Sequence, residues 1–190
     1  STMVESLAVP VTCKIRLMEK GHHIPESQRG LTGTIAFCQK LEHVGCGMIC
    51  VHGRDRHNKG QKISQANWDA IKQIKSRTSL PVVANGNIAS HLDVDQCLKF
   101  TRCDGVMSAE ALLSDPSLFS SSNDESITSL ALEYLDLADL YRPHSFLKST
   151  KSHLYRMLYG YLEKNPGAED LLRHATDNNA CRRVIMALMP

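Results

Sequence analysis

The chain has 190 residues, of which 42% are hydrophobic and 22% are charged, and its formal net charge is +2. These values are typical of a globular protein with a sizeable core, and they exclude disordered, collagen-like and coiled-coil chains. No apolar run approaches the roughly 20 residues that a membrane-spanning helix needs, and no secretory signal opens the sequence. We therefore expect one or two globular domains and no membrane partner.

The seven cysteines include no CxxC pair, and several of them, such as Cys13 and Cys50, lie within apolar runs. This pattern is typical of reduced thiols packed as small hydrophobic side chains. It predicts an intracellular protein, cytoplasmic or nuclear, without a metal site.

Four short runs rich in Val, Ile, Met or Cys predict β-strands buried on both faces, as in a parallel sheet. Their ranges are Val11–Arg16, Gly47–Gly53, Pro81–Gly86 and Gly105–Glu110. Apolar residues at helical spacing predict connecting helices that include Thr34–Val44, Trp68–Ile74 and Val94–Leu98. Because strand and helix alternate, the sequence predicts βαβ units of an α/β fold.

Polar residues recur where each predicted strand ends, in pairs spaced two residues apart that share one side of the strand. The pairs are Lys14 and Arg16, His52 and Arg54, Asn85 and Asn87, and Ser108 and Glu110. A (β/α)8 barrel carries its chemistry on this rim, which favours a barrel over an open sheet. Since four units make half of such a barrel, we predict the last four βα units of a partial (β/α)8, TIM-type barrel.

The composition changes after residue 119, where a serine-rich stretch, Ser120–Asp124, is followed by helical patterns alone. We therefore predict a half-barrel over residues 1–119 and a small all-α domain over residues 120–190. An acidic segment at 124–139 precedes a basic segment at 142–156. The basic segment is either the solvated face of a helix or a surface that meets phosphate.

Several strand-end residues are suited to an anionic ligand. The turn Asn85-Gly86-Asn87 precedes a predicted helix, so it can hold a phosphate or be an ordinary tight turn. Lys14 can pair with an anion, form a Schiff base or extend to solvent. His52 can present a ring nitrogen to a ligand or serve a structural role, and Arg54 can hold a carboxylate or phosphate.

Taken together, these sequence segments resemble those of the tRNA-dihydrouridine synthases, and most closely the 16/17 type. The matching runs are Pro10-Val11-Thr12-Cys13-Lys14-Ile15-Arg16, Val51-His52-Gly53-Arg54, Pro81-Val82-Val83-Ala84-Asn85-Gly86-Asn87-Ile88 and Gly105-Val106-Met107-Ser108-Ala109-Glu110. The resemblance covers the first 119 residues well and the helical tail more loosely.

The resemblance implies a barrel that holds FMN, reduction of that flavin by NADPH, and hydride transfer from the flavin to uridine in tRNA. It implies that Lys14 faces the pyrimidine edge of the flavin and that His52 lies near the flavin and the target base. Arg16 and Arg54 would contact flavin or uridine. The residues implied at the phosphate end are Asn85, Gly86, Asn87, Ala109 and Glu110.

The chain departs from the family pattern at two places. Many members have Gly-Arg where this chain has Ala109-Glu110, so backbone donors would have to hold the phosphate. The family's acid cysteine lies upstream of the lysine strand, in the first half of the barrel, and Cys13 would point away from Lys14. We therefore assign no catalytic residue, and we expect that the chain lacks this upstream half.

A half-barrel leaves two strand edges and an apolar interior exposed, so we also expect that two copies could pair as a homodimer. The leading hypothesis is a flavin-dependent tRNA-dihydrouridine synthase. The alternative is a non-catalytic tRNA-binding module that uses Lys148, Lys151 and Arg156. A third hypothesis is an aldolase-like barrel in which Lys14 forms a Schiff base.

Overall fold

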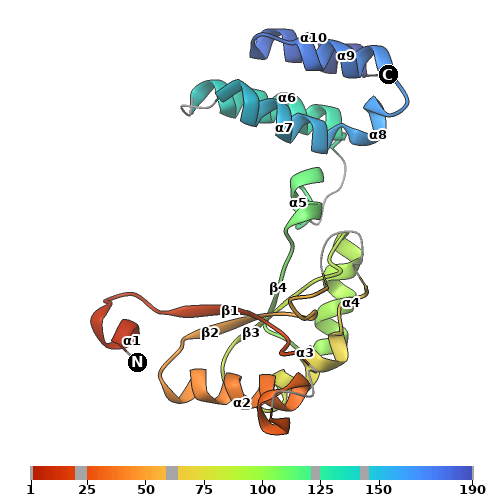
Figure 1. Cartoon of the computed structure of the whole chain (residues 1–190). Coiled ribbons are helices and arrows are strands. Elements are labelled where there is room, and N and C mark those ends of the chain that lie inside the picture. Colours follow the sequence, from red (N-terminus) through yellow and green to blue (C-terminus); the bar gives the residue numbers. More distant parts are fainter. Residues whose placement is uncertain (1, 20–24, 59–63, 121–124, 142–145, 190) are drawn as a thin grey trace. The chain divides into compact units, whose positions relative to one another are not determined.

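The computed structural model describes residues 2–19, 25–58, 64–120, 125–141 and 146–189 (Figure 1). They form two compact units, Ser1–Ser108 and Ala109–Pro190. The predicted linker at Ser120–Asp124 lies almost wholly outside the described residues.

The first unit alternates strands and helices, as the sequence predicts. Its elements are α1 (Thr2–Ser6), β1 (Thr12–Arg16), the short 3₁₀ helix η1 (Glu26–Gln28), α2 (Gly30–His43), β2 (Met48–His52), α3 (Trp68–Lys75), β3 (Val82–Asn85), α4 (His91–Thr101) and β4 (Gly105–Met107). The four strands form one parallel sheet in the order β1-β2-β3-β4. This arrangement confirms the α/β prediction and is consistent with part of a (β/α)8 barrel.

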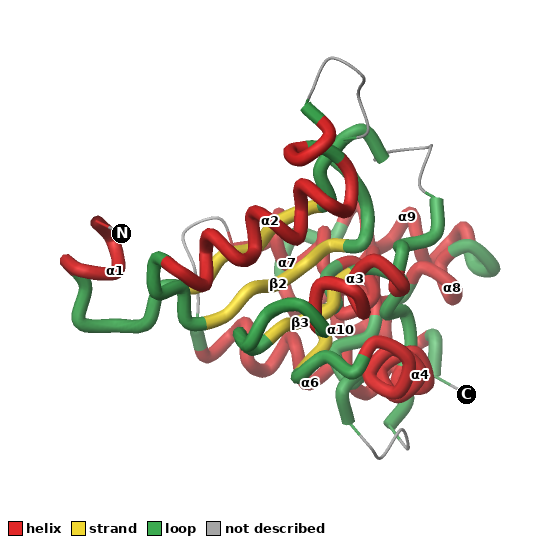
Figure 2. Tube along the Cα trace, turned by 90° about the horizontal axis from the view of Figure 1, so that it is seen from below, coloured by secondary structure: helices red, strands yellow, loops and turns green. Residues whose placement is uncertain are grey.

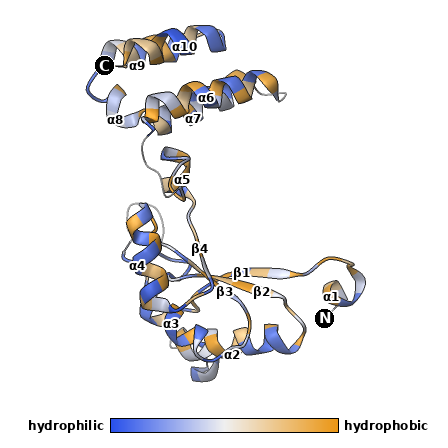
Figure 3. Ribbon diagram, turned by 180° about the vertical axis from the view of Figure 1, so that it is seen from behind, coloured by the Kyte–Doolittle hydropathy of each residue, from blue (hydrophilic) through white to orange (hydrophobic). Residues whose placement is uncertain are grey.

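Helices α2, α3 and α4 cover one face of the sheet (Figures 1 and 2). The side chains of β2 and β3 that are directed toward these helices are apolar and fully buried, and Figure 3 shows β2 in a hydrophobic colour. They include Ile49, Val51, Val82 and Ala84, each 0% exposed. Because side chains alternate along a strand, the neighbouring positions Lys14, Cys50 and Val83 share the opposite face, which we call the open face.

The fourth strand is shorter than predicted. It ends at Met107, and Glu110 begins the short helix α5 (Glu110–Ser114). The Ser108 hydroxyl donates to the carbonyl of Ile88 at 2.8 Å. The prediction that Ser108 and Glu110 share one side of a strand is therefore wrong, because the chain leaves the sheet before either residue.

The described residues of the second unit form helices and no strand. After α5 these are α6 (Ile127–Leu140), α7 (Phe146–Met157), α8 (Tyr159–Leu162), α9 (Pro166–His174) and α10 (Asn178–Ala187). Their apolar faces enclose a core that includes Leu135, Leu154, Leu172 and Ile185, each 0% exposed. The unit begins at Ala109, earlier than the predicted boundary after residue 119, because α5 packs against α7.

None of the described helices combines the length and the apolarity that a bilayer crossing requires. All seven cysteine thiols are free, and six of them are buried. This is the arrangement expected of cysteines that pack as small hydrophobic side chains.

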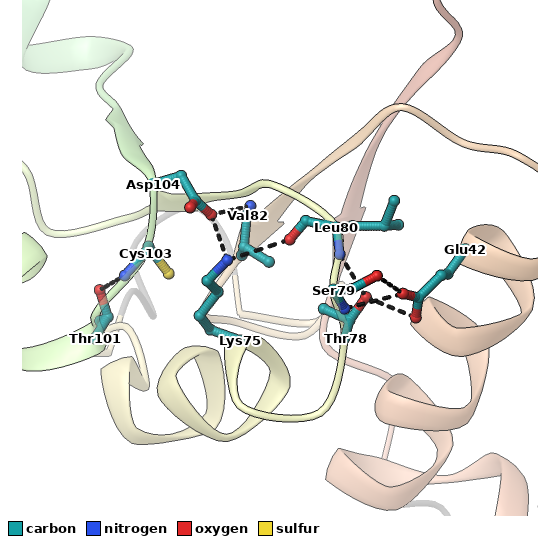
Figure 4. A network of polar contacts seen from close by, with 9 residues as sticks. All are labelled: Glu42, Lys75, Thr78, Ser79, Leu80, Val82, Thr101, Cys103 and Asp104. Atoms are coloured by element: carbon teal, nitrogen blue, oxygen red, sulfur yellow. Dashed lines mark hydrogen bonds and ion pairs between the residues drawn. The ribbon is translucent and has the colours of Figure 1, made fainter.

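A polar network joins the loop before β3 to its neighbours at the amino-terminal edge of the sheet (Figure 4). The Asp104 carboxylate accepts hydrogen bonds from the Val82 N–H and from Lys75 Nζ, both at 2.7 Å. The Glu42 carboxylate accepts from the Ser79 N–H at 2.9 Å and from the Thr78 hydroxyl at 3.0 Å. The network fixes the α3–β3 connection at the edge opposite to the carboxyl ends of the strands.

Replacing the carboxylate of Asp104 should destabilise the first unit. Lys75 and the Val82 N–H hold the pKa of Asp104 below its usual range, so the ionised form stabilises the fold. We expect Asp104→Ala to lower the free energy of unfolding by about 1 kcal/mol at neutral pH, a figure reduced for solvent exposure. The difference should vanish as the pH falls through the lowered pKa of Asp104. Urea denaturation measures both effects.

Asp95→Ala is the matched control, because Asp95 is an exposed aspartate on α4. It should leave the urea midpoint unchanged. Equal midpoints for the two variants would contradict the role given to Asp104.

Candidate functional site

The open face carries one lysine, Lys14. Lys14 lies in register with Cys50 of β2, which lies in register with Val83 of β3, so these three side chains form one row across the face. Lys14 Nζ has no hydrogen-bond or ion-pair partner among the residues that the structure describes. An ammonium group above apolar neighbours is suited to an anionic or strongly polar ligand.

A second row lies nearer the carboxyl ends of the strands. It contains Arg16, His52, Asn85 and Met107, which are in register across the four strands. Asn85 Nδ2 donates to the carbonyl of Met107 at 2.8 Å, and Asn85 is 8% exposed. The register therefore places Lys14, His52 and Asn85 on the same face of the sheet, as the sequence predicts.

The predicted ligand contacts Arg16 and Arg54 both have partners within the chain. Arg16 Nη1 donates to the carbonyl of Asp55 at 2.8 Å. Arg54 Nε donates to the carbonyl of Ser64 at 2.6 Å, and its Nη1 lies 3.1 Å from His52 Nε2. Because a guanidinium group has donors only, His52 Nε2 is the acceptor in this bond.

Arg54 also connects β2 to the turn after β3. Its Nη2 donates to Asn87 Oδ1, and Asn87 Nδ2 donates to Gln65 Oε1. One guanidinium group thus holds the ring of His52 and the side chain of Asn87 at the same edge of the sheet. This contact pattern makes Arg54 a positioning residue in the structure described.

His52 is neutral at physiological pH. Burial, which is the largest cause, and the nearby cations Arg16, Lys14 and Arg54 together lower its pKa to about 4. With Nε2 accepting from Arg54, the single ring proton of the neutral form lies on Nδ1. The three cations around one uncharged ring make this edge of the sheet electropositive.

The turn after β3 has backbone donors that no acceptor in the described part of the chain uses. Gly86 and Asn87 both have positive φ, at 107° and 61°. The N–H groups of Gly86, Asn87 and Ile88 have no hydrogen-bond acceptor among the described residues. Successive free N–H groups in such a turn can bind an anion.

Gly86 is required by close packing as well as by its backbone conformation. A Cβ atom at this position would lie 2.8 Å from Ala66 Cβ and 3.0 Å from His52 Cδ2. The absence of a side chain therefore lets the turn approach His52 closely.

The cysteines of β1 and β2 lie on different faces. Cys13 is in register with the buried Ile49, on the helix-covered face, and burial raises its thiol pKa. This position confirms that Cys13 points away from Lys14. Cys50 lies on the open face, which sequence reasoning did not single out, although the alternation that places Lys14 there could have identified it. Cys50 is 2% exposed and its Sγ lies 3.6 Å from Met107 Sδ, so the thiol is covered rather than available to a ligand.

The remaining predicted site residues lie in the second unit. Ala109 precedes α5, and Glu110 is the first residue of that helix. Their predicted meeting with Asn85, Gly86 and Asn87 stays a prediction.

The three cations predicted to bind tRNA differ in their surroundings. Lys148 is exposed on α7. Lys151 Nζ donates to the carbonyls of Arg173 and Ala175, at 2.7 and 3.2 Å, where α9 ends. Arg156 Nη1 lies 3.4 Å from Glu110 Oε1. The structure therefore gives Lys151 and Arg156 intramolecular partners, whereas Lys148 has none among the described residues.

The protonation state of His52 can be measured directly. We expect the ring to remain neutral, with its proton on Nδ1, at about pH 5.5, where an ordinary histidine is mostly protonated. Histidine ¹H–¹⁵N correlation spectra report both properties, and the His52→Gln variant assigns the signal.

Arg54→Met should raise the pKa of His52 part of the way toward 6.5, because the variant removes one cation while burial persists. Arg56→Met is the control, since Arg56 pairs with Glu19 instead. Titration of wild-type His52 near 6.5 would show that the ring is not held in this way.

Known proteins match the chain over most of its length. A profile of the family described as Dihydrouridine synthase (Dus) matches residues 1–183. A Mus musculus protein named as tRNA-dihydrouridine(16/17) synthase NAD(P)(+)-like is 38% identical over 160 residues, which are 84% of this chain and 31% of that protein. A Schizosaccharomyces pombe tRNA-dihydrouridine(16/17) synthase is 31% identical over 163 residues, 80% of this chain and 38% of that protein.

A second Mus musculus protein, named as a tRNA-dihydrouridine(20a/20b) synthase, is 38% identical over 116 residues, 61% of this chain and 32% of that protein. The chain spans about a third of the length of these relatives. The family profile covers both units, including the strands that carry Lys14, His52 and Asn85. The chain belongs to the dihydrouridine synthase family.

Proposed function

We propose that this chain contributes the carboxyl-terminal half of the flavin site in a tRNA-dihydrouridine synthase of the 16/17 type, which reduces uridine in tRNA with NADPH. The proposal rests on the family match together with one structural observation. That observation is the shared open face, on which Lys14 and His52 lie, together with the free N–H groups of the turn after β3 among the described residues.

The residues of the open face fit FMN. Three cations lie around His52, and an isoalloxazine ring that gains electrons develops negative charge at its pyrimidine edge. The free N–H groups of Gly86, Asn87 and Ile88 are suited to the phosphate of the same molecule. FMN bound here would supply hydride-transfer chemistry, with NADPH as the reductant and uridine as the acceptor.

Lys14 and His52 would have different roles. The Lys14 ammonium group has no internal partner among the described residues, so it would stabilise negative charge on the ligand. His52 is neutral, so it would donate a hydrogen bond from Nδ1 rather than act as a cationic acid. Arg54 would keep the ring in this tautomer through Nε2.

The sheet would be the last four βα units of the family barrel, followed by a small all-α domain. The edges at β1 and β4 have no partner strand among the described residues. We infer that a further segment of a longer protein completes the barrel and supplies the acid cysteine. A second copy of the chain is the alternative partner for the same edges.

Lys14→Met should weaken FMN binding by about tenfold, because it removes a charge-assisted contact while keeping most of the side-chain volume. Quenching of flavin fluorescence by the purified chain measures the affinity. Lys40→Met is the control, since Lys40 is an exposed lysine on α2. Equal FMN affinity for Lys14→Met and wild type would remove Lys14 from the site.

A chimera tests the reaction in a complete protein. Residues 1–183 would replace the matching segment of the Saccharomyces cerevisiae tRNA-dihydrouridine(16/17) synthase, which is 31% identical over 172 residues. We expect the chimera to restore dihydrouridine to tRNA from yeast that lacks this synthase, as measured by mass spectrometry of nucleosides. A folded, flavin-loaded chimera that forms no dihydrouridine would refute the proposed function.

A further inference from the structure

A pocket lies in the first unit, between α3 and α4. Its volume is about 500 Å³, and its lining residues are Trp68, Lys72, Gln96, Lys99, Phe100 and Arg102. None of these residues belongs to the open face, since all six come from helices or a helix end.

Two aromatic rings form the apolar part of this pocket. The ring centroids of Trp68 and Phe100 are 6.5 Å apart, with 42° between the ring planes. Phe100 is 46% exposed, and Lys72 Nζ lies 5.0 Å from the centroid of its ring. A large aromatic surface that stays partly in water is a platform on which a flat, apolar group can stack.

The charged residues that line the pocket all have the same sign. Lys72, Lys99 and Arg102 are exposed, and none of them forms an ion pair with another described residue. No aspartate or glutamate is among the six lining residues. Lys72 lies in the last turn of α3 and Lys99 in the last turn of α4, so the two helix ends bring cations to one place.

We propose that this pocket binds an unpaired nucleotide of the RNA substrate, with the base stacked on the Trp68–Phe100 pair and the phosphates near Lys99 and Arg102. Aromatic stacking combined with a cationic rim is the usual way in which proteins bind single-stranded nucleic acid. An exposed Lys72–Phe100 contact is weak, so Lys72 can leave the ring when a base occupies it. The inference depends on the proposed function only for the identity of the nucleic acid as tRNA.

The indole of Trp68 also links the pocket to the turn after β3. Its Nε1 donates to the carbonyl of Gly86 at 3.0 Å, which fixes the ring at one edge of the pocket. This bond gives Trp68 a structural role, so the test leaves Trp68 in place and uses its signal. Trp68 is the single tryptophan of the chain.

The experiment is a fluorescence titration of the purified chain with a short single-stranded oligouridylate. Because Trp68 is the sole tryptophan, quenching of its emission reports binding at the pocket or at the adjacent turn after β3, and the variants below distinguish the two. We expect saturable quenching that weakens as salt is raised, since phosphate contacts displace counterions. A double-stranded RNA of equal length should quench less, because its bases are already stacked on one another.

Two variants test the residues. The double variant Lys99→Glu/Arg102→Glu should weaken oligouridylate binding by about tenfold or more and reduce its salt dependence. Phe100→Leu should also weaken binding, but it should change the salt dependence less than the double variant does. Lys40→Glu is the matched charge reversal on exposed α2 and should bind like wild type. Circular dichroism checks that each variant is folded.

Absence of quenching, or equal affinity for the Lys99→Glu/Arg102→Glu and Lys40→Glu proteins, would overturn the proposal. FMN affinity separates this failure from a failure of the proposed function. The pocket variants should bind FMN like wild type, because their side chains are not on the open face.

Discussion

The parallel register of β1, β2 and β3 is the constraint on which the site depends. It pairs Lys14 with Cys50 and His52 with Asn85, so functional side chains from separate segments of the chain share one face. The opposite face is fixed by apolar burial under α2, α3 and α4. A slip of one residue would turn Lys14 into the helix-covered core, where an unpaired charge is costly.

Much of this arrangement follows from the sequence, because strands buried in a parallel sheet appear as short, continuous runs of apolar residues. Runs of Val, Ile and Cys located all four strands, and alternation placed Cys13 and Lys14 on opposite faces. The pattern did not locate the end of β4, since Ala109-Glu110-Ala111-Leu112 suits a helix start as well as a strand. The partners of Arg54 could not be predicted either, because its acceptors on Ser64, His52 and Asn87 are brought together only by folding.

The helical tail illustrates a different limit of sequence reasoning. A run of basic residues indicates charge but not the partner of each side chain. Lys151 caps the carbonyls where α9 ends, Arg156 meets Glu110, and Arg182 pairs with Asp136 and Asp139. By contrast, the cations beside Trp68 and Phe100 are scattered over α3 and α4 in the sequence and meet only in the folded unit.

The central claim is that Lys14, His52 and the turn at Gly86 surround one flavin nucleotide. Intermolecular nuclear Overhauser effects in a complex of FMN with the isotope-labelled protein test it most directly. The account predicts contacts from the flavin ring to the side chains of Lys14 and His52, and shifted amide signals for Gly86, Asn87 and Ile88. Bound FMN whose contacts all lie on other residues would contradict the account.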